Sequence, residues 1–168
     1  MELTEDMVLL KLKQNLFITK EKIDELSNLN PAKENFEREC YRLTSELCTW
    51  ITVTFEFWMG RDAIFKERIK GNETLLGIKQ AFNSFKHNFD IIGVSHNEEI
   101  SFNSEENNCY IKRLVWLSSE LLEDDKNNKR AFEAYQNNFK DKAVVIKLEA
   151  AFQILMAELV YKSIRENP

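Results

Sequence analysis

Apolar residues recur every three or four positions along most of this chain, which is the spacing of an amphipathic helix. The clearest example covers residues 72–90. Asn72 is a suitable N-cap, and Glu73 places a negative charge in the first turn, where the helix dipole favours it. The apolar face of this segment consists of Leu75, Ile78, Phe82, Phe85 and Phe89. We therefore predict a helix over residues 72–90 and treat it as the central element of the fold.

The same spacing predicts four further helices, over residues 4–29, 32–59, 129–139 and 141–165. Thr4 and Asp141 are the expected N-caps of the first and last of these helices, and Pro31 suits the first position of the second. The short turn between the first two helices predicts an antiparallel hairpin. The first helix carries its core seam at Leu9, Leu12, Leu16, Ile23 and Leu26.

In three segments the sequence is compatible with more than one local structure. Residues 49–57 are rich in β-branched and aromatic side chains and suit a strand, although the helical spacing on both sides favours a helix buried nearly all round. Residues 60–71 form either a basic connector or an extra helical turn. Residues 90–116 lose the helical period and predict an irregular excursion, with a small β-hairpin as one alternative. The fold class that follows is a single all-α domain over residues 1–168, a helical bundle of about four long helices plus short ones.

Composition supports one packed, membrane-free domain. The chain has 168 residues, of which 43% are hydrophobic and 12 are Phe, enough for a substantial core. No stretch approaches the roughly 18 uninterrupted apolar residues of a membrane span. Cys40, Cys48 and Cys109 are an odd number at no metal-ligand spacing, which predicts free, buried thiols in a reducing compartment. Because the N-terminus is acidic before its short apolar run, we also expect no signal peptide and a cytoplasmic location.

The net charge of −5 argues against general nucleic-acid binding through the whole surface, but it leaves room for a local basic patch. One candidate patch is the group Arg61, Lys66, Arg68 and Lys70, which is either a solvated connector or a phosphate-contacting surface near the start of the central helix. The acidic residues 98–106 are either a solvated loop or a mimic of phosphate charge. The aromatic residues Trp50, Phe55, Phe57 and Trp58 belong either to the core or to a homodimer face.

The candidate chemistry lies in a polar row on the central helix. Gln80, Asn83 and His87 follow one another at three or four positions, so their side chains lie on neighbouring turns. An imidazole titrates near neutrality and can act as a general acid or base, and the Asn83 amide can orient it by a hydrogen bond. The alternative is a structural pair at the helix edge. His96 falls in the irregular segment, and no second histidine stands at ligand spacing, so we predict no metal and no cofactor.

A resemblance arises at residues 83–88, which read Asn-Ser-Phe-Lys-His-Asn within an internal helix. This segment resembles the HEPN family of small helical-bundle proteins, whose ribonuclease motif is an arginine, a polar residue, three variable residues and a histidine. Asn83 and His87 match the polar residue and the histidine, whereas Phe82 stands at the arginine position. Residues 72–155 also resemble uncharacterised bacterial proteins that carry a Lys-His-Asn segment.

The resemblance implies a homodimeric, metal-independent endoribonuclease of the toxin or phage-defence kind, with His87 and Asn83 at the catalytic centre. Since Phe82 replaces the arginine, a cation to hold the phosphate would come from Lys79, Lys86 or Arg68, or from another chain, with Arg61 as a further phosphate contact. The first functional hypothesis is a HEPN-like protein that binds RNA or a nucleotide, with ribonuclease activity left open. The alternative is a non-catalytic helical interaction protein that regulates a protein partner.

Overall fold

The computed structural model describes residues 4–87, 90–95, 113–119 and 126–166, and it confirms the all-α prediction with a small hairpin. The elements in chain order are α1 (Glu5–Ser27), α2 (Phe36–Met59), α3 (Ala63–Ile69), α4 (Glu73–Lys86), β1 (Ile92–Ser95), β2 (Arg113–Trp116), α5 (Lys126–Asn138) and α6 (Val144–Glu166). Within the described residues, none of the helices is long and apolar enough to cross a lipid bilayer.

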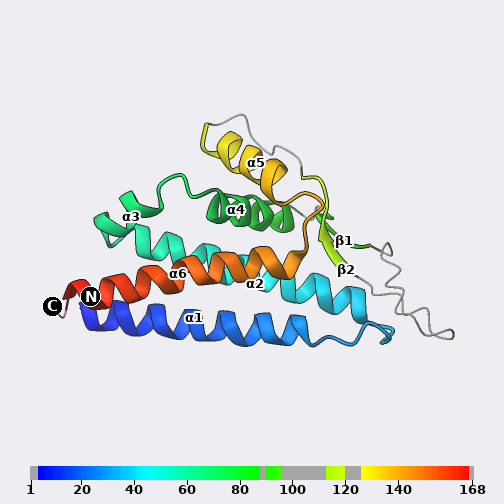
Figure 1. Cartoon of the computed structure of the whole chain (residues 1–168), viewed down its shortest axis with the longest axis horizontal. Coiled ribbons are helices and arrows are strands. Elements are labelled where there is room, and N and C mark those ends of the chain that lie inside the picture. The colour runs from blue at the N-terminus through cyan, green and yellow to red at the C-terminus, as the bar shows by residue number, and fades with distance from the viewer. Residues whose placement is uncertain (1–3, 88–89, 96–112, 120–125, 167–168) are drawn as a thin grey trace, which may run out of the picture.

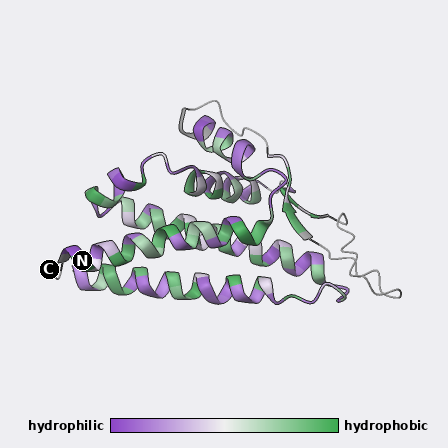
Figure 2. Cartoon of the chain, viewed as in Figure 1, coloured by the Kyte–Doolittle hydropathy of each residue, from purple (hydrophilic) through white to green (hydrophobic). Residues whose placement is uncertain are grey.

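The three long helices α1, α2 and α6 pack against one another, and the shorter helices α3, α4 and α5 lie to one side of them (Figure 1). Helix α1 runs antiparallel to both α2 and α6, so the described ends of the chain lie side by side. Helix α4 packs against α2 and α6, and α5 packs on α4. Helix α3 lies at the end of the bundle near the termini, and the hairpin lies at the other end. Figure 2 shows that each long helix alternates between hydrophobic and hydrophilic residues, as expected for helices that bury one face.

Helix α2 supplies the centre of the core because α1, α3, α4 and α6 all pack against it. Leu43, Leu47 and Ile51 have no exposed surface, and Trp58 has almost none. Residues 49–57 are helical, so the strand alternative is wrong. The expectation that this half of α2 is buried all round is correct only in part, because Val53 remains 46% exposed.

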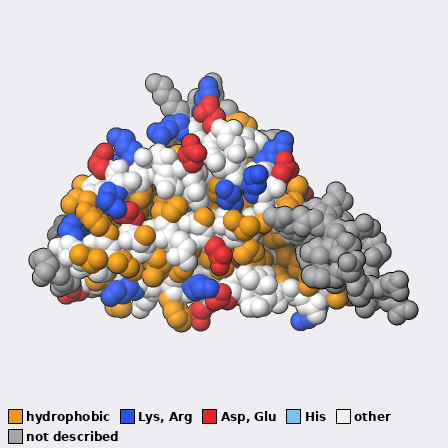
Figure 3. Space-filling view, viewed as in Figure 1, with side chains coloured by type: hydrophobic (Ala, Val, Ile, Leu, Met, Phe, Trp, Pro, Cys, Tyr) orange, Lys and Arg blue, Asp and Glu red, His pale blue; other side chains and the backbone are white. Residues whose placement is uncertain are grey.

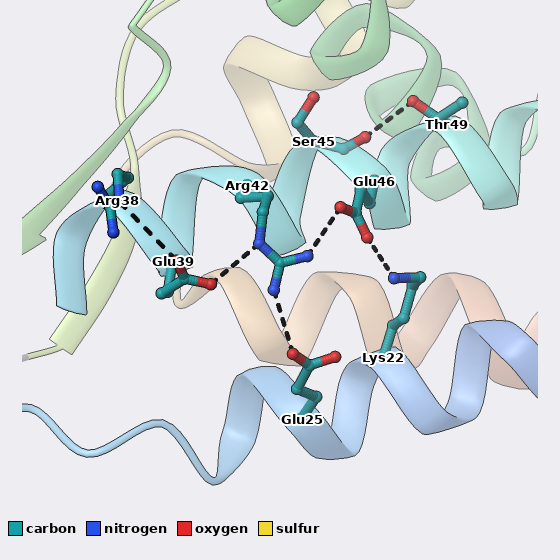
Figure 4. Close-up of polar contacts among 8 residues, drawn as sticks. All are labelled: Lys22, Glu25, Arg38, Glu39, Arg42, Ser45, Glu46 and Thr49. Atoms are coloured by element: carbon teal, nitrogen blue, oxygen red, sulfur yellow. Dashed lines mark hydrogen bonds and ion pairs between the residues drawn. The ribbon is translucent and has the colours of Figure 1, made fainter. Parts of the chain in front are cut away.

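Ion pairs fix how α1 and α2 lie against each other (Figure 4). Arg42 of α2 donates to Glu39 and Glu46 on its own helix, at 2.9 and 2.8 Å, and to Glu25 of α1 at 3.1 Å. Lys22 of α1 pairs with the other oxygen of Glu46. Exposed pairs of this kind contribute little stability individually, so their main effect is on the relative position of the two helices.

The observed helix starts agree with the predicted ones where a side chain caps the helix, and they differ where no such cap forms. Asn72 caps α4 by accepting a hydrogen bond from the Leu75 N–H at 3.1 Å, and Thr4 caps α1 in the same way. Helix α2 begins at Phe36, so the prediction that it starts near residue 32, with Pro31 at the first position, is wrong. Asp141 does not cap α6 either, because its N–H donates to the Trp116 carbonyl at 2.8 Å in a turn with a φ of 62°, and the helix begins only at Val144.

The hairpin attaches the excursion to the bundle. Strands β1 and β2 are antiparallel, with Ile92 opposite Trp116, and the Trp116 side chain is fully buried. The Tyr135 hydroxyl of α5 donates to the Leu117 carbonyl at 2.7 Å, which ties the end of the hairpin to α5. Residues 96–112 lie outside the described part of the chain, and with them His96, Cys109 and the acidic stretch.

Close packing of α5 on α4 depends on Gly77. A Cβ built on Gly77 would lie 2.2 Å from a ring carbon of Phe139, a side chain with no exposed surface. We therefore expect Gly77→Ala to destabilise the protein by roughly 2 kcal/mol, the range of overpacking in a close-packed core. Urea denaturation followed by circular dichroism measures this change.

The matched control is Gly60→Ala at the end of α2. A Cβ on Gly60 would meet nothing closer than 3.5 Å, and the residue already has a right-handed helical conformation. Its substitution should leave the free energy of unfolding within about 0.5 kcal/mol of the wild type. Equal effects of the two substitutions would contradict the packing argument.

Candidate functional site

A pocket of about 310 Å³ opens where α2 ends and α4 begins. Four helices and the turn between α3 and α4 contribute to it. The lining residues are Phe55 and Met59 from α2, Lys66 and Ile69 from α3, Lys70, Gly71 and Asn72 from the turn, Leu75, Leu76 and Lys79 from α4, and Arg130 from α5. A volume of this size is at the lower end of the range for small-molecule sites.

The apolar part of the pocket comes from residues that also anchor the helices. Phe55 and Met59 are four positions apart on α2, so they lie on one face, and Phe55 is buried in the core. Ile69 of α3 and Leu75 of α4, which also line the pocket, are buried as well. The pocket therefore has a wall that the core holds rigidly, and it does not depend on loop side chains alone.

The charged residues that line the pocket are all basic. Lys79 pairs with Glu56 at 2.8 Å, and Lys70 makes a weaker, exposed pair with Glu67 at 3.7 Å. Lys66 and Arg130 are exposed and have no ion-pair partner in the described part of the chain. Figure 3 shows Lys and Arg side chains over α3, α4 and α5, with Asp and Glu side chains between them, so the basic character belongs to the pocket lining and not to the whole face. This end of the molecule can therefore attract an anion even though the whole chain is acidic.

Gly71 permits the turn that brings the cations together. Its φ of 81° lies in the left-handed region, which glycine adopts without strain. A Cβ at this position would also lie 2.8 Å from an Nη atom of Arg130, so the absence of a side chain lets the guanidinium lie against the backbone. The turn thus places α5 within reach of the start of α4.

Helix α3, which carries Lys66, is held in place from both sides. The Phe65 ring stacks on Trp58 of α2 with centroids 4.0 Å apart. On the other side, Arg68 donates to both carboxylate oxygens of Glu158 on α6, at 2.8 and 3.0 Å. Its guanidinium also lies 3.9 Å from the centre of the Tyr161 ring. These contacts fix a seven-residue helix that is too short to be stable alone.

Asp62 joins α3 to the end of α6. It caps α3 by accepting from the Phe65 N–H at 3.0 Å, and its other oxygen lies 3.0 Å from Arg165 and 3.5 Å from Lys162. Burial by itself raises the pKa of this carboxyl. The Phe65 N–H and the charges of Arg165 and Lys162 outweigh that effect and lower the pKa to about 2.

The phosphate contacts predicted from the sequence are only partly assembled. Lys79 lines the pocket, whereas Arg68 is engaged by Glu158 and Arg61 lies over the Phe57 ring and donates to its carbonyl. Lys86 is exposed at the other end of α4. Of the four residues Lys79, Lys86, Arg68 and Arg61, the structure thus places one in the basic pocket.

His87 is exposed and stands at the C-terminal end of α4, where its N–H donates to the Asn83 and Ser84 carbonyls at 3.2 and 3.1 Å. In the described residues, no side-chain hydrogen bond joins Asn83 to His87. The pocket follows the first half of α4 as far as Lys79, and the eight helical steps from Lys79 to His87 span about 12 Å. Within one chain, His87 and the pocket cations are therefore separate.

Gln80 does not share the polar row with His87. Its side chain is buried and donates from Nε2 to Ser119 Oγ at 2.8 Å, and Ser119 Oγ is also 2.7 Å from Ser84 Oγ. Gln136 of α5 donates to the Ser119 carbonyl at 2.8 Å. This buried network holds the segment after β2 between α4 and α5, which is a structural role.

The buried cysteines agree with the expectation of free thiols. Cys40 and Cys48 are both buried and unbridged. Burial raises the pKa of Cys40 to about 11, with a smaller contribution from Glu37 and Glu39, and it also raises the pKa of Cys48. Neither thiol is therefore activated as a nucleophile. Among the described residues, no group of three or more His, Cys, Asp or Glu side chains is placed to hold a metal ion.

Sequence reasoning missed two contributors to the molecular surface. Arg130 joins the pocket from a helix that begins 40 positions after α4 ends, so no local spacing indicated it. The other is a second apolar stripe on α1, formed by Met7, Leu10 and Phe17, for which the spacing was visible in the sequence.

Searches of protein family models, curated proteins and solved structures found no match to this chain. The HEPN resemblance therefore stays a prediction.

The low pKa of Asp62 predicts a pH dependence of stability. Its folded pKa lies below its unfolded value, so the carboxylate stabilises the fold above about pH 4, and this contribution disappears as the pH falls towards 2. A shift of this size corresponds to about 2 kcal/mol. Asp62→Asn, which can still cap α3, should be less stable than the wild type by about this amount at pH 7.

The measurement is urea denaturation of both proteins at several pH values between 2 and 7. The gap between the two free energies of unfolding should narrow steadily below pH 4. Asp141→Asn serves as a control because Asp141 is exposed. A gap for Asp62→Asn that does not change with pH would show that the charge is not the source of the stabilisation.

Proposed function

We propose that the protein binds a nucleoside phosphate, either free or as part of single-stranded RNA, in the basic pocket between α2, α3, α4 and α5. One observation carries this proposal: Lys66 and Arg130 stand over an apolar wall and have no ion-pair partner in the described residues. Lysine and arginine neutralise phosphate, and the arginine fork can donate two hydrogen bonds to it.

The apolar wall supports a ligand that is more than a bare anion. Met59 and Leu76, which are half-buried, offer a surface on which a base or sugar can pack while its phosphate remains at the basic rim. Inorganic phosphate would leave this wall uncovered. The proposal therefore expects a nucleoside phosphate to bind more tightly than phosphate alone, because it also removes apolar surface from water.

The lining of the pocket supports binding more than catalysis. Its described lining residues include no His, Cys, Asp or Glu, so lysine is the one common general base or nucleophile among them. We infer that the pocket recognises its ligand and that any chemistry takes place elsewhere. The homodimer expected from the sequence remains a prediction, as does an interaction with a regulated protein partner.

Charge reversal in the pocket tests the proposal. Lys66→Glu should weaken binding of a fluorescent ribonucleoside triphosphate and of a labelled single-stranded RNA by at least about tenfold, since it replaces an attraction by a repulsion. For RNA, the slope of log affinity against log salt concentration should also fall by about 1 or more. Fluorescence anisotropy measures both quantities.

Lys33→Glu is the matched control. Lys33 is exposed in the turn between α1 and α2, at the opposite end of the molecule from α3, and its substitution changes the net charge equally. Equal losses for the two variants would mean that overall charge governs binding, and absence of binding to the wild type would overturn the proposal. A protein that binds the RNA but not the mononucleotide has RNA as its ligand, and one that binds the mononucleotide but not the RNA has the free nucleoside phosphate as its ligand.

A second candidate function is the ribonuclease activity implied by the HEPN resemblance. The exposure of His87 and its neighbour Lys86 at the end of α4 supports it, since both side chains can reach a substrate. We expect any such cleavage to persist in EDTA and to fall at least about a hundredfold in His87→Ala, the usual effect of losing a general acid or base. Electrophoresis of labelled RNA after incubation with each protein measures cleavage.

Ile164→Ala serves as the control for that assay, because Ile164 is 65% exposed near the end of α6, and this end of the bundle lies opposite the end where α4 finishes at His87. Cleavage that EDTA abolishes, or that survives in His87→Ala, would contradict the ribonuclease prediction. Neither result affects the binding pocket, which is tested by anisotropy alone.

A further inference from the structure

A second surface, independent of the basic pocket, lies along α1. An open groove of about 910 Å³ is bordered by α1 and by Trp50 of α2. The residues that line it are Met7, Leu10, Lys11, Lys13, Gln14, Asn15, Phe17, Ile18 and Trp50. Leu10 is 57% exposed and Phe17 is 64% exposed, which is unusual for side chains of this size on one helix.

The exposed apolar side chains form a stripe and are not scattered. Met7, Leu10, Gln14 and Phe17 are separated by three, four and three positions, so they lie along one side of α1. The buried residues Leu12 and Leu16 occupy the side that faces the core. Helix α1 is therefore apolar on two sides, and the described residues cover only one of them. A contiguous exposed patch of this kind marks an interaction surface.

Charge distinguishes the partners that this groove can accept. Among the described residues that line it, Lys11 and Lys13 are charged and none is acidic. Lys11 also lies 5.0 Å from the centre of the Phe57 ring, which keeps its charge at the edge of the groove. A partner with carboxylates on either side of an apolar face would gain electrostatic complementarity, whereas a partner with cations there would be repelled.

The dimensions suit a helix. From Met7 to Ile18 the groove follows twelve residues of α1, which span about 17 Å and correspond to roughly three turns of a partner helix. A second copy of this chain suits it less well. Pairing α1 with α1 about a twofold axis would place the same patch opposite itself, and with it two lysines per chain opposite two lysines.

We propose that this groove binds an amphipathic helix of a different protein, with large apolar residues on one face and Glu or Asp beside them. The apolar anchors enter between α1 and Trp50, and the acidic residues pair with Lys11 and Lys13. This mode uses anchors at three- and four-residue spacing on the partner helix. The inference concerns a separate surface and does not depend on the nucleoside phosphate pocket.

The test uses two designed helical peptides of about four turns that share one apolar face of Leu and Phe and carry either Glu or Lys beside it. Binding is followed by anisotropy of the labelled peptide and by the change in tryptophan emission, which reports on Trp50 because the buried Trp58 and Trp116 keep their surroundings when the groove is filled. The Glu peptide should bind at least tenfold more tightly than the Lys peptide. The double substitution Lys11→Glu with Lys13→Glu should reverse this order.

Phe17→Asp should weaken binding of the Glu peptide at least tenfold without affecting the fold, because Phe17 is exposed. The matched control is Ile146→Asp on α6, a similar change at a residue that is 59% exposed and does not line the groove, which should bind as the wild type does. Circular dichroism of each variant verifies folding.

Three results would overturn the proposal. Equal binding of the two peptides would remove the charge argument, and binding that survives Phe17→Asp would place the site elsewhere. The third is a dimer in light scattering that Phe17→Asp converts to a monomer, because a second copy of the chain would then occupy the groove.

Discussion

Burial of α2 among α1, α3, α4 and α6 is the constraint on which the rest of the structure depends. Leu43, Leu47 and Ile51 lose all contact with water, and burial of each such side chain contributes roughly 2 kcal/mol. The same helix also supplies part of both candidate binding surfaces. Its last turns give the pocket Phe55 and Met59, and its middle gives the groove Trp50. Both surfaces are therefore built on a rigid element, as preorganised sites require.

The charged residues near α3 fall into two groups, those that form ion pairs within the protein and those that do not. Asp62 with Arg165, and Arg68 with Glu158, use their charges to fix α3 and are therefore committed to structure. Lys66 and Arg130 form no ion pair within the described residues, so their charges can interact with a ligand. His87 stands about the length of α4 away from them. A site that combines the His87 imidazole with Lys66 or Arg130 would therefore take these residues from two chains, as the HEPN resemblance also implies.

The sequence predicted the helices well because their period and caps are local properties. Thr4 and Asn72 cap as expected, and residues 49–57 are helical since tertiary burial outweighs their β propensity. Local reasoning failed where a distant contact decides the conformation. Asp141 bonds to Trp116 instead of capping α6, Gln80 turns inward to Ser119, and Arg130 reaches the start of α4. The stripe of Met7, Leu10 and Phe17 was present in the sequence beside the core seam of α1, but the core seam alone was identified.

The most direct test of the account is to locate the bound ligand on the protein. Two-dimensional ¹H–¹⁵N NMR of the labelled full chain, titrated with a ribonucleoside monophosphate, reports which backbone amides lie near it. The account predicts the largest shift changes at Lys66, Gly71, Asn72 and Arg130, which surround the pocket. Changes confined to the amides around Asn83 and His87, or no changes at saturating ligand, would contradict it.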